Sequence, residues 1–163
     1  MKKTLSAIAM AAMLITAANS HAQTVVQGEI TSNTTWSSPV LIRGPLFVRS
    51  GATLTVAAGT TVYGEKATLA ALIIDRGAKL NAVGTKDSPV LFTSDQPAGT
   101  QARADWGGII INGYSTLNIP GGTKQGEGDT GIFGCTAGVD CNEADNSGTL
   151  QYMRVEYGGI QFS

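Results

Sequence analysis

The sequence predicts an all-β protein wound into a parallel β-helix, which is a stack of coils made of short strands and turns. The main observation is a repeat, since residues 46–56 (LFVRSGATLTV) return 26 positions later as residues 72–82 (LIIDRGAKLNA). Each copy begins with an apolar triplet, which is too short for a helix. A glycine after two polar residues indicates a turn, so we expect Gly51 and Gly77 to stack at one corner. A repeat of this length predicts coils of about 25 residues.

A second repeat supports the same coil length. Residues 38–42 (SPVLI) recur as residues 88–92 (SPVLF), and the offset of 50 positions is close to twice the offset of the first repeat. Proline stands at the start of each copy, where its missing N–H is tolerated. Two separate marks in the sequence therefore predict stacked coils, with Leu54 lying on Leu80 of the neighbouring coil.

Residues 1–22 have the three-part form of a secretory signal peptide. Lys2 and Lys3 precede an apolar run, and the small residues Ser20 and Ala22 indicate cleavage after Ala22. The alternative is an anchor helix that stays attached, but the run is short for a membrane span, and no later stretch holds the roughly 20 apolar residues that a span needs. We therefore expect an exported protein without a membrane span after cleavage, located in the periplasm, on the outer surface or outside the cell.

Charge and histidine content exclude several classes of function. The whole chain has 11 Lys and Arg against 12 Asp and Glu, and removal of the two signal lysines leaves a mature net charge of 9 − 12 = −3. No basic surface for nucleic acid is therefore expected. The single histidine, His21, belongs to the signal, so the mature chain has no imidazole for general-base catalysis or metal binding.

The mature chain divides into a cap and a stack of coils. Residues 23–45 are polar and rich in Thr and Ser, and we interpret them as an N-terminal cap with the first strand. Trp36 is expected to be the apolar lid of this cap. Residues 46–163 then hold the β-helix coils, and any helix is expected only in the signal or the cap.

Side-chain alternation predicts which residues face the interior. In the strand after Gly-Ala, Leu54 points inward and Thr55 points outward, and Asn81 takes the outward place in the next coil, where stacked amides form a ladder. Residues 109–111 (III) are bounded by glycines and predict a buried parallel strand. Residues 93–105 are polar and predict a loop that projects from a corner.

Residues 121–148 depart from the repeat and predict a loop excursion. They are rich in glycine and contain the only two cysteines, Cys135 and Cys141. In an exported protein this pair predicts a disulfide, and closure of so short a loop contributes about 2 kcal/mol of stability by chain entropy. A zinc site on the two thiolates is a poor alternative, because neither a histidine nor a third cysteine is present to complete it.

The excursion also carries a group of oxygen-bearing side chains that are the candidates for a calcium site: Asp140, Asn142, Glu143 and Asp145. Their number suits calcium, but their spacing is not that of an EF-hand loop. A solvated acidic loop is the simpler interpretation. We therefore predict no metal site and no cofactor, with calcium at these residues as the alternative.

A last strand is predicted within residues 149–157, with Met153, Val155 and Tyr157 facing inward. The chain stops at Ser163 without a capping segment, so we expect it to be the N-terminal part of a longer protein. An uncovered coil exposes apolar side chains and free strand edges. We therefore expect self-association through this end of the stack.

Four short motifs carry a resemblance to a known group of proteins. They are residues 50–60 (SGATLTVAAGT), 92–94 (FTS), 105–109 (DWGGI) and 154–157 (RVEY). The run of residues 28–160 resembles the N-terminal portion of exported bacterial proteins with a right-handed parallel β-helix, which are mostly of unknown function. The resemblance covers nearly all of the mature chain and implies the fold. Because its motifs are structural, it implies no activity.

Two classes of function remain open. The first is a structural or binding β-helix that serves cell-surface adhesion or contact with an extracellular glycan and has no catalytic residue. The alternative is a polysaccharide lyase or hydrolase, because pectate lyases and polygalacturonases use the same scaffold. Asp75 and Arg76, at a strand end, are the best catalytic candidates, although a plain polar corner contains the same residues. The other active residues of such an enzyme are expected outside this chain.

Overall fold

The computed structural model describes residues 23–160, which are made almost entirely of strands and turns. The expected signal peptide, residues 1–22, lies outside the described residues. In chain order the strands are β1 (Thr24–Ile30), β2 (Thr34–Trp36), β3 (Val40–Val48), β4 (Thr53–Val56), β5 (Thr61–Gly64), β6 (Ala71–Ile74), β7 (Lys79–Val83), β8 (Val90–Ser94), β9 (Gly108–Ile111), β10 (Thr123–Gln125), β11 (Ile132–Gly134), β12 (Gly148–Gln151) and β13 (Met153–Val155).

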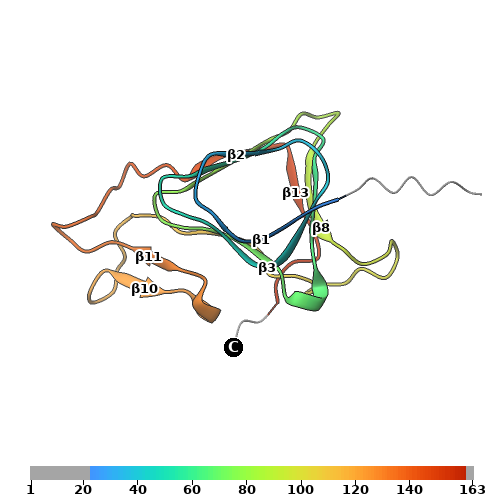
Figure 1. Ribbon diagram of the computed structural model, residues 1–163. Helices are drawn as coiled ribbons and strands as arrows, with labels where there is room; N and C mark the ends of the chain where they lie inside the picture. The colour runs from blue at the N-terminus through green and yellow to red at the C-terminus, as the bar shows by residue number, and fades with distance from the viewer. Residues whose placement is uncertain (1–22, 161–163) are drawn as a thin grey trace, which may run out of the picture.

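The strands stack in parallel around a common core. One sheet has the order β13-β8-β5-β3-β6-β9, with β1 beside β3, and a second has the order β12-β7-β4-β2. The long strand β3 pairs with β5 through residues 40–42 and with β6 through residues 45–48, so it runs along two walls. In Figure 1 the coils lie behind one another and outline a roughly triangular cross-section. The predicted parallel β-helix is therefore confirmed.

The register between coils follows the main sequence repeat. Leu46 pairs with Leu72 across β3 and β6, and Leu54 pairs with Leu80 across β4 and β7. The Gly51 N–H donates to the Gly77 carbonyl at 3.0 Å, and the two glycines have φ angles of 86° and 77°. Only glycine adopts this left-handed backbone without steric cost, which is why it recurs at this corner. The predicted stacking of the two copies is confirmed.

The second sequence repeat is two residues out of structural register. Val40 pairs with Val62, and Val62 pairs with Phe92, so Val40 is aligned with Phe92 rather than with Val90. The structural offset is therefore 92 − 40 = 52 residues, not 50. A shift of two residues leaves the same side chains facing inward, because strand side chains alternate with a period of two. The sequence motif alone could not reveal this difference.

The core is a column of inward aliphatic side chains from successive coils. Leu54 and Leu80 are both 0% exposed, whereas Thr55 and Asn81 lie on the outer face and are half-buried. Burial of each leucine removes its apolar surface from water, which is worth roughly 2 kcal/mol per side chain. This column supplies most of the apolar burial that holds one coil on the next.

The N-terminal residues form strands that continue the stack. Residues 23–45, expected to hold a cap and a first strand, contain β1, β2 and the start of β3. Strand β1 pairs in parallel with β3, and β2 pairs in parallel with β4. Trp36 is buried in the core cluster, where it is aligned with Val56 of the next coil.

Two single-turn 3-10 helices lie outside the expected cap, η1 (Lys66–Thr68) and η2 (Glu127–Asp129). The prediction that helix would be confined to the signal or the cap is therefore wrong. In η1 the Leu69 N–H donates to the Lys66 carbonyl at 3.1 Å, which satisfies both backbone groups within the turn. Among residues 23–160, no helix has the length and apolar character to cross a membrane.

Strand β9 is parallel, as predicted, but it is not fully buried. It pairs with β6 along one edge, and Ile111 remains 39% exposed. Its sequence is as apolar as that of β6, whose residues are all buried because strands lie on both sides of it. The apolar composition of β9 therefore predicts a strand, but it does not show that this strand has a neighbour on only one side.

The polar loop after β8 is anchored at its end by a buried carboxylate. Asp105 accepts hydrogen bonds from the Ser94 hydroxyl at 2.6 Å and the Ala102 N–H at 2.9 Å, and Lys66 Nζ lies 2.8 Å from its other oxygen. The Lys66 ammonium, followed by Ser94 and Ala102, lowers the pKa of the Asp105 carboxyl from 3.8 to about 2. Residues 97–100 of the loop are exposed, and the Asp105 contacts attach its end to the stack.

The last coil keeps the inward row that the sequence predicts. Met153 pairs with Val90 and Val155 pairs with Phe92, so both take inward positions. Met153 and Tyr157 pack against the core, whereas Val155 is 48% exposed because no further strand follows among the described residues.

Replacement of Leu54 by alanine should lower the free energy of unfolding by about 3 kcal/mol, because it opens a cavity in the column between two coils. Thr55→Ala, at the outward neighbour, is the matched control and should cost less than about 1 kcal/mol. Urea unfolding of both variants measures the difference. Equal losses in the two variants would contradict the assigned faces of β4.

Asp105 should give the fold a specific acid sensitivity. Because folding lowers its pKa, the ionised carboxylate stabilises the fold fully above about pH 4, and this contribution is lost as the pH falls from 3.8 towards about 2. Unfolding free energies measured across this range should fall more steeply for the native protein than for Asp105→Asn. The same slope in both proteins would show that the contacts of Asp105 do not stabilise its ionised form.

Candidate functional site

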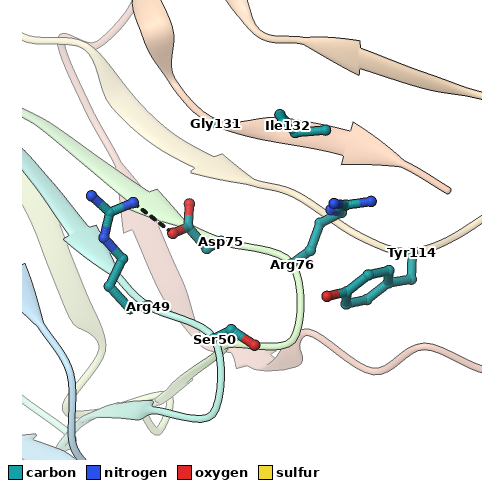
Figure 2. Close-up of a pocket in the computed structure, with 7 residues that line it drawn as sticks. All are labelled: Arg49, Ser50, Asp75, Arg76, Tyr114, Gly131 and Ile132. Atoms are coloured by element: carbon teal, nitrogen blue, oxygen red, sulfur yellow. Dashed lines mark hydrogen bonds and ion pairs between the residues drawn. The ribbon is translucent and has the colours of Figure 1, made fainter. Parts of the chain in front are cut away.

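The main candidate site is an open pocket at one corner of the β-helix. It lies where β3 and β6 end and where the β10–β11 hairpin of the excursion lies beside the stack. Figure 2 shows its lining side chains, which come from the corner and from the excursion. The pocket has a volume of about 330 Å³ and is lined by Arg49, Ser50, Asp75, Arg76, Tyr114, Gly131 and Ile132.

The coil register brings the corner residues of this pocket together. Val48 and Ile74 are aligned, so the next residues, Arg49 and Asp75, occupy equivalent positions in neighbouring coils. The Asp75 N–H donates to the Val48 carbonyl at 3.0 Å, which continues the ladder into the corner. Arg76 then follows Asp75 in the same way that Ser50 follows Arg49. Two dipeptides 26 residues apart thus form one side of the pocket.

Arg49 lies between two carboxylates. Its Nη1 is 2.8 Å from Asp75 Oδ2, and its Nη2 is 2.5 Å from Glu29 Oε1. Its guanidinium carbon also lies 4.2 Å from the centroid of the Phe47 ring. The hydrogen bond and charge of Arg49 lower the pKa of Glu29, and the two carboxylates raise the pKa of Arg49. Asp75 is therefore held in an ion pair rather than presented alone to the pocket.

Arg76 joins the corner to the excursion. Its Nη1 donates to the Gly134 carbonyl at 2.7 Å and to Asp140 Oδ2 at 3.2 Å. Its guanidinium carbon lies 4.7 Å from the centroid of the Tyr114 ring. Figure 2 shows Arg76 above this ring and the Tyr114 hydroxyl directed toward the middle of the pocket. Asp75 and Arg76, adjacent in sequence, thus serve different partners.

The excursion is more ordered than a loop. Residues 121–148 contain an antiparallel hairpin in which β10 pairs with β11, and the Gly134 N–H donates to the Gly113 carbonyl at 3.0 Å. The predicted disulfide between Cys135 and Cys141 is present, and Cys135 is 1% exposed. A Cβ atom at Gly134 would lie 2.4 Å from the backbone carbonyl oxygen of Gly122, and the φ of Gly134 is 84°, so glycine is required at this position.

Two of the calcium candidates organise turns inside the excursion. Asp140 Oδ1 accepts from the Thr136 N–H at 2.6 Å, while its other oxygen contacts Arg76. Asn142 Oδ1 accepts from the Ala144 N–H at 3.1 Å. Short polar side chains that bond to a nearby backbone in this way are typical of turns.

The other two calcium candidates attach the excursion to the segment after β9. Glu143 accepts from the Ser115 hydroxyl at 2.7 Å and from the Thr116 N–H at 2.9 Å. The hydroxyls of Thr116 and Ser115 and the Thr116 N–H lower the pKa of Glu143. Asp145 Oδ2 accepts from the Tyr114 N–H at 3.0 Å. These carboxylates act as anchors between segments.

The four candidates do not converge on one point. Within the described residues, no group of three or more His, Cys, Asp or Glu side chains is placed to hold a metal ion. The carboxylates of Asp140, Glu143 and Asp145 instead have backbone or side-chain donors as partners. The residues present therefore do not make the oxygen cage that calcium needs.

The chemistry of the pocket is that of a hydrogen-bonding surface. The Arg76 guanidinium only donates hydrogen bonds, and its Nη1 already donates to the Gly134 carbonyl and to Asp140. Asp75 is bound to Arg49, so neither candidate is free as a base. The pocket does offer the hydroxyls of Ser50 and Tyr114, which can donate and accept hydrogen bonds.

Sequence reasoning identified only part of this site. It singled out Asp75 and Arg76, but not Arg49 and Ser50, although the 26-residue repeat aligns the two pairs. Tyr114 and the hairpin residues Gly131 and Ile132 carry no repeat signal. Tyr114 reaches the pocket because it follows β9, which pairs with β6, whereas Gly131 and Ile132 reach it because the excursion folds back on the corner.

The comparison with known families agrees with this architecture. A family model described as the pectate-lyase-like beta helix domain matches residues 28–163, most of the chain. No curated protein and no solved structure matches the chain significantly. The chain therefore belongs to the family of pectate-lyase-like β-helix domains.

Proposed function

We propose that this protein is an exported β-helix module that binds an extracellular glycan at the corner pocket, without catalysis. One observation carries the proposal: an open pocket of about 330 Å³ combines hydroxyl groups and an aromatic ring, while its two catalytic candidates are both engaged in ion pairs. Such a site can recognise a polar ligand but has no free base to transform it.

The lining groups suit the hydroxyls of a sugar. Sugar hydroxyls both donate and accept hydrogen bonds, as do the hydroxyls of Ser50 and Tyr114. A pocket with a few convergent polar groups and an aromatic ring fixes the orientation of a small ring-shaped ligand. Arg49 and Arg76 remain 37% and 20% exposed, so each side chain still presents surface to the pocket.

The charge balance favours an uncharged sugar over a polyanion. The two guanidiniums of the site face three carboxylates, those of Glu29, Asp75 and Asp140. The local sum is therefore 2 − 3 = −1, which gives an anionic chain no net attraction. We infer that the preferred ligand is a neutral glycan on a cell or matrix surface.

The proposed export rests on residues 1–22, whose composition is that of a secretory signal. The disulfide between Cys135 and Cys141 supports this inference, because such bonds persist in oxidising compartments. We also propose that the β-helix is right-handed, since parallel crossover connections are right-handed in nearly all proteins.

A polysaccharide lyase or hydrolase is the second candidate function. Similarity to pectate-lyase-like β-helix domains favours it, although a shared fold does not assign an activity. An enzyme of this kind would cleave the polymer and release new ends, whereas the proposed binding module would leave the polymer intact. Detection of cleaved polysaccharide would therefore distinguish the enzyme from the binding module.

The test is binding of the purified protein to a panel of neutral and uronic-acid polysaccharides, followed by analysis for new reducing ends and unsaturated products. We expect saturable binding to a neutral glycan without product. Tyr114→Ala should weaken that binding about tenfold, which corresponds to about 1.4 kcal/mol. Tyr63→Ala, on another wall of the stack, is the matched control and should bind normally.

Two outcomes would contradict the proposal. Release of unsaturated or reducing products from any polymer would favour the enzyme. Equal binding by the native protein and Tyr114→Ala would show that the glycan contacts another surface.

A further inference from the structure

The disulfide between Cys135 and Cys141 closes a ring of residues 135–141 in the excursion. The residues that immediately precede the two cysteines both contact one atom of the candidate site, Nη1 of Arg76. Gly134 immediately precedes Cys135, and Asp140 immediately precedes Cys141. Both of these preceding residues accept a hydrogen bond from Nη1 of Arg76. The two segments that the disulfide ties together therefore provide both acceptors for one guanidinium nitrogen.

We propose that the Cys135–Cys141 ring positions Arg76 in the pocket. The bond fixes the distance between the two segments, and so places the Gly134 carbonyl and the Asp140 carboxylate together in front of Arg76. Arg76 is then held with its guanidinium over the ring of Tyr114, at 4.7 Å from the centroid. Arg76 is thus a positioning residue of the pocket, and the disulfide preorganises it.

Contacts inside the ring make it a compact unit. Asp140 Oδ1 accepts from the Thr136 N–H at 2.6 Å, and the Val139 N–H donates to the Thr136 carbonyl at 3.0 Å. These bonds orient Asp140 so that its second oxygen faces Arg76. The buried Cys135 holds one side of the ring against the stack. Opening of the disulfide would release the more exposed side, which carries Asp140.

Preorganisation matters here because an arginine side chain has many rotamers. Fixing such a side chain costs conformational entropy, and a ligand that had to order Arg76 itself would bind more weakly. Because the ring orders Arg76 when the protein folds, the ligand does not have to order it on binding. The consequence for ligand affinity rests on the glycan-binding function proposed above, whereas the position of Arg76 does not.

The position of Arg76 can be tested without any ligand. The full protein and the double variant Cys135→Ser with Cys141→Ser are treated with phenylglyoxal, which modifies accessible guanidinium groups, and each arginine is followed by peptide mass spectrometry. We expect Arg76 to be modified severalfold faster in the double variant. Arg43 and Arg49 are internal controls, because their ion pairs with Glu65, Glu29 and Asp75 lie within the coils and should be unaffected.

A second variant separates the ring from general loosening. Asp140→Asn keeps the disulfide but removes the carboxylate, so Arg76 should react at a rate between those of the native protein and the double variant. An unchanged Arg76 rate in the double variant would overturn the proposal. An equal rise at Arg43, Arg49 and Arg76 would also overturn it, because the disulfide would then support the whole fold rather than one side chain.

The same proteins can be measured against the neutral glycan identified by the polysaccharide panel. The double variant should bind it severalfold more weakly than the native protein. Arg76→Lys, with the disulfide intact, should also bind more weakly than the native protein, since an ammonium cannot reproduce the planar contacts of a guanidinium. If Arg76 is modified faster in the double variant but glycan binding is unchanged, the ring positions Arg76 but Arg76 does not contribute to binding in the pocket.

Discussion

The parallel register between coils is the constraint on which the rest of the structure depends. Leu46 lies on Leu72 and Leu54 on Leu80, so each inward side chain is buried by its equivalent in the next coil. A short strand has too little apolar surface to be stable alone, and stacking supplies the missing contacts. A slip of one residue would turn every inward side chain toward solvent, which is why the register is strongly specified.

The same register creates the candidate site. Residues that follow aligned strands must stack at the corner, and this is how Arg49 and Asp75 come to form an ion pair 26 residues apart in sequence. The excursion then completes the pocket from the side, through Arg76 and its contacts with Gly134 and Asp140. The scaffold provides fixed positions, and one irregular segment provides the shape that distinguishes this corner from the others.

The coils of the main repeat and the disulfide could be predicted from the sequence, but the path of the excursion and the exact register of the second repeat could not. Leu54 and Leu80 occupy matching places in the 26-residue repeat, which coincides with one coil, so their contact could be predicted. Ile132 belongs to no repeat, and its place in the pocket depends on how the excursion folds. Carboxylates such as Glu143 resembled metal ligands in sequence because spacing does not show that each one already binds a backbone N–H.

Residue-resolved hydrogen exchange of the native protein tests the central claim most directly, because protection reports the free energy of opening each part of the chain. If stacked coils hold the structure together, the slowest amides should lie in β3–β8, where strands have neighbours on both sides, and those in β10 and β11 should exchange faster. The contradicting result is strongest protection within residues 121–148, which would show that the excursion, rather than the coil register, is the stable centre of the fold.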